Sequence, residues 1–101
     1  MDITTEIIGG RASVHLVGRF DLKTNLDFRN ATKPLLAATD VDTLVVDFAQ
    51  VGFADSSALG LLLLLREQAL VAGKKVILAN CGNALQKTLA IAQFNRLFTI
   101  E

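Results

Sequence analysis

The sequence predicts an α/β domain with a mixed central β-sheet and elements in the order ββαβαβαβ. Two observations support this prediction. Runs of β-branched and apolar residues alternate with longer segments of helical pattern. The connections between them are short, which favours parallel strand pairs joined by right-handed crossovers. Because 101 residues supply about one hydrophobic core, we expect a single domain over residues 1–101.

The first two strands are expected to form an antiparallel hairpin at an edge of the sheet. Residues 3–8 and 12–17 are rich in β-branched and apolar residues, and Gly9 and Gly10 lie between them. A glycine pair supplies the positive φ angles that a tight hairpin turn requires. Residues 18–21 are expected to follow as a loop.

The middle of the chain predicts two helices around a central strand. Residues 24–38 have a helical pattern, but Pro34 predicts a kink or a division into two shorter helices. Residues 43–48 form a β-branched and apolar run, which is typical of a strand covered on both faces. Residues 58–72 consist almost entirely of good helix formers and are followed by Gly73, a common residue after a helix.

The last third of the chain predicts shorter elements. Residues 76–79 are expected to form a strand, residues 84–92 a helix and residues 97–100 a terminal strand. The chain therefore ends on a strand of the same sheet.

A run of leucines in the second helix needs a cover. Leu59 and residues 61–65 occupy every face of a helix, because successive residues turn by about 100°. A helix that lies on a sheet needs only one apolar stripe, so some of these leucines must contact something else. Either the third helix covers them, or they form a docking surface for a partner beside Ser56.

Composition excludes several classes of function. Ten basic residues balance ten acidic residues, which argues against direct nucleic-acid binding. The single Cys81 cannot form an internal disulfide, so a reducing cytoplasmic location is expected. The longest apolar run, residues 58–65, is far shorter than the ~20 residues of a membrane-spanning helix. The amino-terminal residues have no secretory signal pattern, so we expect no membrane insertion.

Catalytic chemistry is also not expected. His15 is the only histidine and lies in a predicted strand, where it has no evident partner for general base catalysis. Cys81 has no second cysteine or histidine near it in the sequence. No glycine-rich phosphate-binding loop is present. We therefore expect no enzyme activity, no cofactor and no metal site.

One segment, residues 53–60 (Phe-Ala-Asp-Ser-Ser-Ala-Leu-Gly), joins a predicted strand to a predicted helix. Asp55 and the serines there are good helix N-caps, which is the simpler structural interpretation. A hydroxyl at this place also lies at the positive end of the helix dipole, where a phosphate is favoured. Phosphorylation would add a charge of about −1.5 to −2 to the loop.

Three segments taken in order carry a family resemblance. They are residues 18–21 (Gly-Arg-Phe-Asp), residues 45–48 (Val-Val-Asp-Phe) with residues 51–60 after them, and residues 97–100 (Leu-Phe-Thr-Ile). Together they resemble STAS domains of the anti-sigma-factor antagonist type, over almost the whole chain from residue 3 to residue 100. The Asp-Ser-Ser motif followed by Leu-Gly is the most specific part. This family usually has glycine where the present chain has Ala58, and the added methyl either crowds a partner or is tolerated within the helix.

The resemblance implies a partner-switching regulator. In such proteins a serine after the motif aspartate, here Ser56, is phosphorylated by a kinase that is also an anti-sigma factor. The unphosphorylated protein captures that kinase and frees the sigma factor, and a phosphatase resets the system. Asp21 would lie near the acceptor, and Asp55 would orient the acceptor or cap the helix. The partner-binding residues that the resemblance implies are Asp21, Asp55, Ser56, Ser57, Leu59 and Gly60.

A second interpretation comes from the shortness of the chain, since many antagonists have a further helix after the last strand. The short form resembles the small STAS subunits that bind the ATPase of a bacterial phospholipid-transport ABC system. In that case Ser56 and its surroundings would form a permanent interface with the ATPase.

Overall fold

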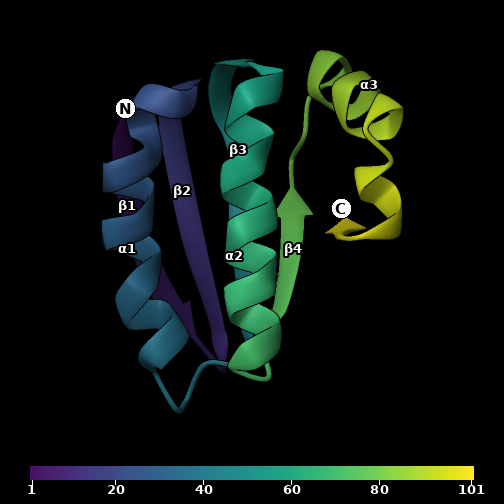
Figure 1. Cartoon of the computed structure of the whole chain (residues 1–101). Coiled ribbons are helices and arrows are strands. Elements are labelled where there is room, and N and C mark those ends of the chain that lie inside the picture. The colour runs from purple at the N-terminus through teal and green to yellow at the C-terminus, as the bar shows by residue number, and fades with distance from the viewer.

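The computed structural model describes residues 1–101 and contains one five-stranded sheet in the spatial order β1-β2-β3-β4-β5 (Figure 1). β1 is antiparallel to β2, and the remaining neighbours pair in parallel. The predicted mixed α/β fold with the order ββαβαβαβ is therefore confirmed. The strands are β1 (Asp2–Ile8), β2 (Arg11–Phe20), β3 (Thr43–Ala54), β4 (Lys75–Ala79) and β5 (Thr99–Ile100).

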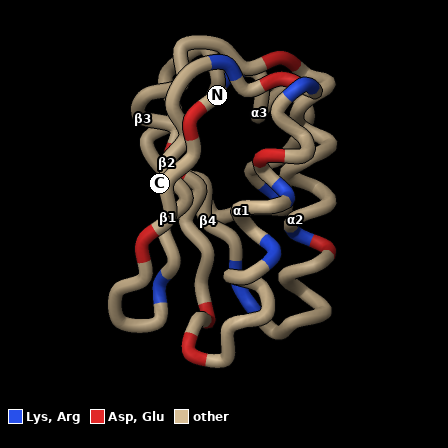
Figure 2. The backbone as a smooth tube through the Cα atoms, turned by 90° about the vertical axis from the view of Figure 1, so that its left-hand side faces the viewer, with Lys and Arg blue, Asp and Glu red and all other residues tan.

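Three α-helices connect the parallel strands. They are α1 (Asn25–Ala37), α2 (Leu59–Val71) and α3 (Asn83–Ile91). Because each crossover leads to the next strand in the same direction, right-handed connections return the helices to one face of the sheet. Seen edge-on, the strands and the helices α1 and α2 form two separate layers (Figure 2). None of the helices has the length and apolarity needed to cross a bilayer.

The hairpin turn agrees with the prediction, since Gly9 and Gly10 have φ angles of +57° and +83°. β2 and β3 are longer than predicted, and residues 18–21 are not a separate loop. Gly18, Arg19 and Phe20 pair with residues of β3, with two irregularities of register. This extension could not be predicted from the sequence pattern, because Gly18 and Arg19 interrupt the alternation of apolar and polar residues that is typical of a strand.

Pro34 does not divide the first helix, which was predicted to kink or to split; α1 continues through it to Ala37. Pro34 cannot donate a hydrogen bond to the carbonyl of Asn30. Both residues are exposed, so that carbonyl is open to water and the loss is tolerated. The last predicted strand is also shorter than expected, because residues 94–96 form a 3₁₀ turn and β5 begins at Thr99.

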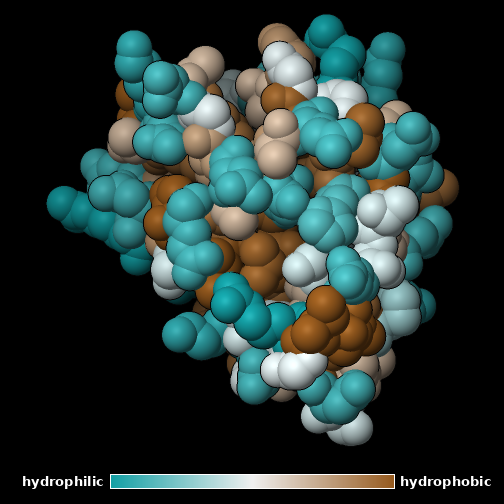
Figure 3. Space-filling view, turned by 180° about the vertical axis from the view of Figure 1, so that it is seen from behind, coloured by the Kyte–Doolittle hydropathy of each residue, from teal (hydrophilic) through white to brown (hydrophobic).

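The main core lies between the sheet and the helices. Phe20 contacts the rings of Phe28 and Phe48 edge-on, with 5.5 Å between centroids in each pair. On the other face of the sheet, three buried residues form a small separate cluster: Val45, Ile77 and Ala79. No helix covers this face, and hydrophobic surface is visible there between polar groups (Figure 3). Val45 is nevertheless buried on this face, in a cluster with Ile77 and Ala79, so residues 44–46 are buried on both faces as predicted although a helix covers only one of them.

The leucine run is mostly accounted for by the core. Leu61, Leu62 and Leu65 are buried, whereas Leu63 is 37% exposed. α1 and β4 pack against α2, so the sheet and the first helix provide the cover that the third helix was expected to give. The docking surface beside Ser56 was the alternative, and most of these side chains are not available for it.

Candidate functional site

The junction between β3 and α2 is organised by one carboxylate. Asp55 has extended backbone and is the N-cap of a 3₁₀ turn over Ser56–Ala58 that leads directly into α2. Its Oδ1 accepts a hydrogen bond from the Ala58 N–H at 2.9 Å and another from the Ser57 hydroxyl at 2.8 Å. The predicted capping role of Asp55 is confirmed, and the hydrogen bonds that shape the turn do not use the side chain of Ser56, whose carbonyl accepts from the Leu59 N–H.

The two serines have different environments. The hydroxyl of Ser57 is engaged by Asp55, while no hydrogen bond within the protein engages the hydroxyl of Ser56. Ser56 is exposed. Its side chain therefore lies free at the start of the helical segment, where unpaired backbone N–H groups and the helix dipole favour negative charge.

The loop that carries Asp21 lies next to this junction. Phe20 pairs with Ala54 at the ends of β2 and β3, and the backbone N–H of Asp55 donates to the Phe20 carbonyl at 3.3 Å. Asp21 is itself an N-cap, because its side chain accepts from the Lys23 N–H at 3.0 Å. Two 3₁₀ turns, each with an aspartate as its N-cap, thus begin at the paired ends of β2 and β3, and Asp21 lies beside the turn that carries Ser56.

Three further positions of the motif can be placed. Leu59 is only 5% exposed and packs in the core, so it does not present its side chain to a partner in this structure. Gly60 is exposed, and no atom lies within 4 Å of where a Cβ would stand. Ala58 is fully buried, so its extra methyl points into the protein and does not crowd the surface around Ser56.

Sequence reasoning missed an aromatic surface beside this junction. Phe53 is 42% exposed, and the Arg19 guanidinium lies 4.1 Å from the centre of its ring, in the geometry of a cation–π contact. A cleft of about 400 Å³ lies between residues 51–54 and the start of α3, with residues 82–85 on its other wall. The available signal in the sequence was a phenylalanine two residues before Asp55, but only the fold shows that it is exposed and which segments form the cleft.

His15 has a partner that the sequence did not indicate. Its Nδ1 lies 2.8 Å from Asp47 Oδ2, and its Nε2 lies 3.8 Å from Glu6 Oε2, on the sheet face that no helix covers. Partial burial raises the pKa of Asp47, but hydrogen bonds from Asn80, the Ala49 N–H and His15 together bring it below its usual value. This cluster lies on the sheet itself, apart from the turn that carries Ser56.

Cys81 is buried, and burial together with the charge of Asp47 raises the pKa of its thiol to about 11. Because the thiolate is the reactive form, native Cys81 is expected to react with Ellman's reagent at pH 8 roughly 100-fold more slowly than in the unfolded chain. The measurement compares rates in buffer and in concentrated urea. Equal rates would contradict the buried position of the thiol.

Comparison with known proteins places this geometry in a family. The family model described as Mlab, STAS domain, matches residues 3–99. A STAS-domain containing protein of Pseudomonas aeruginosa is 40% identical over 93 residues, which are 92% of this chain and 90% of that protein.

Solved structures show the same fold at lower identity. The unphosphorylated anti-sigma factor antagonist SpoIIAA gives a TM-score of 0.75 at 21% identity and covers 99% of this chain and 87% of its own. An anti-sigma factor antagonist from Mycobacterium paratuberculosis gives a TM-score of 0.85 at 20% identity, and the match covers 98% of this chain and 83% of that one. A sulfate transporter family protein from Wolinella succinogenes gives a TM-score of 0.74 at 14% identity, and the match covers 90% of this chain and 73% of that one. With a family model matched over residues 3–99, this chain belongs to the STAS-domain family.

Proposed function

We propose that this protein is an anti-sigma-factor antagonist that is switched by phosphorylation of Ser56. In the unphosphorylated state it binds an anti-sigma factor that is also a serine kinase, and the sigma factor is released. A phosphatase restores this state after phosphorylation. The observation that carries the proposal is the free and exposed hydroxyl of Ser56 on a turn that Asp55 holds in shape.

The geometry suits a switch that works without refolding. The contacts of the Asp55 carboxylate with Ala58 and Ser57 do not involve Ser56, so a phosphate on Ser56 leaves the cap intact. Such a phosphate adds about −1.5 to −2 charges beside the carboxylates of Asp21 and Asp55. A partner surface that accommodates the neutral hydroxyl then meets a dense negative group, and the kinase is released.

Similar folds support this proposal. SpoIIAA, an anti-sigma factor antagonist, has been solved in an unphosphorylated and a phosphorylated form, and both resemble the present chain at a TM-score of 0.75. The domain would be the substrate of the kinase and bring no catalytic group of its own. Asp21, next to the Ser56 turn, would contact the kinase.

The test is capture of partners from native lysate with wild type, Ser56→Ala and Ser56→Asp as baits. A kinase-type anti-sigma factor should bind wild type and Ser56→Ala with affinities within about twofold. Ser56→Asp should bind at least tenfold more weakly, about 1.4 kcal/mol. Phosphate should be found on Ser56 by mass spectrometry.

A matched control distinguishes an effect of the position of the negative charge from an effect of the added charge itself. Thr39→Asp places the same charge on an exposed residue before β3, at the opposite end of the sheet, and should bind like wild type. If Ser56→Asp keeps wild-type affinity for the partner, or if Thr39→Asp loses it equally, the proposed switch is wrong.

A second candidate is an accessory subunit of a phospholipid-transport ABC system. The match to the family model described as Mlab favours keeping it. In that case the lysate experiment would bring down an ABC-type ATPase with membrane components, and Ser56 would carry no phosphate.

A further inference from the structure

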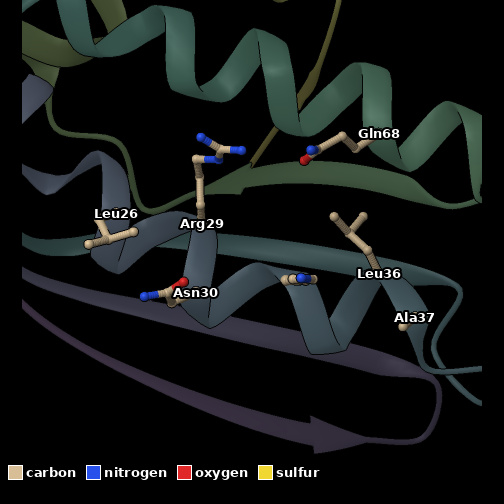
Figure 4. Close-up of a pocket in the computed structure, with 7 residues that line it drawn as sticks. Leu26, Arg29, Asn30, Leu36, Ala37 and Gln68 are labelled. Carbon is tan, nitrogen blue, oxygen red and sulfur yellow. The ribbon is translucent and has the colours of Figure 1, made fainter.

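The helical layer has a groove of its own, away from the Ser56 turn. α1 and α2 lie side by side in front of the sheet, and the groove between them measures about 560 Å³ (Figures 1 and 4). α1 provides most of its lining and α2 provides Gln68. In Figure 4 the side chain of Arg29 rises from α1 into the space towards α2.

The lining residues of α1 form one stripe. Leu26, Arg29, Lys33 and Leu36 are spaced by three, four and three residues, so they follow one face of the helix. Cations lie in the middle of this stripe and leucines at its two ends. Leu26 is 68% exposed, which is high for a leucine whose neighbours on the helix are packed against a core.

The two cations are not neutralised within the protein. Neither Arg29 nor Lys33 takes part in an ion pair, and no acidic residue lines the groove. The whole chain has no net charge, so this pair is a local excess of positive charge. The groove therefore matches an occupant with acidic groups between apolar groups.

We propose that the α1–α2 groove binds an acidic amphipathic helix of a partner protein. The stripe from Leu26 to Leu36 covers ten steps of helix rise, about 15 Å, which a partner helix of three turns matches in length. In this complex, two acidic residues of the partner helix, four positions apart, face Arg29 and Lys33. The partner helix also has an apolar residue three positions before the first acidic residue and another three positions after the second. These two apolar residues pack on Leu26 and Leu36, as in other helix-in-groove complexes.

Other ligand classes fit less well. A lipid chain or a drug-sized molecule needs a mostly apolar cavity around it, and four of the seven lining residues here are polar. An added strand needs a free sheet edge, and the groove lies between two helices. A helix satisfies its own backbone hydrogen bonds, so it needs only side-chain complementarity.

The proposal goes beyond the switch at Ser56 and does not depend on it. No residue of the Asp55–Ala58 turn lines the groove. Leu26 nevertheless lies only two residues after the end of the Asp21-capped 3₁₀ turn, so a partner bound at Asp21 can extend a segment into the groove. Such a segment would add a second, phosphate-independent contact to the same assembly.

The first test uses a synthetic peptide and the isotope-labelled full chain. The peptide is a 15-residue helix former that contains two apolar and two acidic residues in a fixed spacing. The first apolar residue is followed three positions later by an acidic residue, the second acidic residue comes four positions after the first, and the second apolar residue comes three positions after that. We expect saturable NMR shifts confined to residues 26–37 and the facing side of α2. A scrambled peptide of equal composition should bind at least tenfold more weakly. Shifts elsewhere, no saturable binding below 1 mM, or equal binding of the scrambled peptide would overturn the proposal.

Charge reversal supplies the matched comparison. The double variant Arg29→Glu with Lys33→Glu should bind the peptide at least tenfold more weakly than wild type. Lys75→Glu with Lys87→Glu changes the net charge equally at exposed sites outside the groove and should bind within twofold of wild type. Leu26→Ser, a single exposed change without charge, should weaken binding about threefold or more. Equal loss in both double variants would show attraction by net charge alone and reject the site.

A photo-crosslinker placed at residue 30 then identifies the native occupant in cells. Mass spectrometry of the crosslinked segment should find an acidic amphipathic helix with the stated spacing, and a basic or non-helical segment would reject the proposal. Ser56→Asp should bind the synthetic peptide like wild type. Failure of the groove variants would therefore leave the Ser56 switch untouched, and failure of Ser56→Asp to weaken the kinase would leave the groove untouched.

Discussion

Replacing Phe20 by alanine is expected to lower the free energy of unfolding by about 3–5 kcal/mol. Phe20 is fully buried and contacts Phe28 and Phe48 edge-on, so the substitution removes a large apolar group from the centre of the core. Urea unfolding followed by circular dichroism measures the loss. Because small domains have a stability of only about 5–15 kcal/mol, this variant should be close to unfolding at 37 °C.

Phe53→Ala is the matched control, since the same group is removed near the same end of the sheet. Phe53 is partly exposed and contacts the Arg19 guanidinium, so its loss should cost about 1 kcal/mol or less. A similar cost for the two variants would contradict the placement of Phe20 in the core. Phe20 also accepts the backbone hydrogen bond from Asp55, so partner binding should be tested only where the variant is folded.

The second large effect is expected within the leucine run. Leu62→Ala should cost about 2–5 kcal/mol, because Leu62 is fully buried in the main hydrophobic core. For a domain of this size a loss of 1 kcal/mol lowers Tm by roughly 4–8 °C, so a decrease of about 10 °C or more should be seen in a thermal melt.

Leu63→Ala provides the comparison within the same helix and the same sequence context. Alanine favours helix slightly more than leucine, and Leu63 is on the outer face, so we expect a change in unfolding free energy below about 1 kcal/mol. If Leu63→Ala proved as costly as Leu62→Ala in the monomeric chain, the assignment of faces in α2 would be wrong.

The local features of the candidate site could be predicted from the sequence. Asp55 caps the turn before α2 because a short carboxylate side chain reaches N–H groups only a few residues away. The hydroxyl at position 56 follows from the same local pattern, since strand residues end and helix formers begin there. Such interactions join near neighbours in the chain and need no knowledge of the fold.

The features that the sequence did not reveal join distant residues. Phe53 meets Arg19 only because β2 and β3 pair to their ends, and His15 meets Asp47 only because these strands are neighbours. The extension of β2 through Gly18 depends on the same pairing, because hydrogen bonds from β3 stabilise residues whose own strand propensity is low.

By itself, the sequence determined the order of strands and helices, the glycine turn of the hairpin, and the Asp55 cap with the serine that follows it before α2. Only the tertiary structure decided which sheet face has no helix, which leucines are buried and where Arg29 and Lys33 face α2. The physical reason is range. Propensity, turns and caps act over a few residues, whereas burial and grooves depend on which surfaces the crossovers bring together.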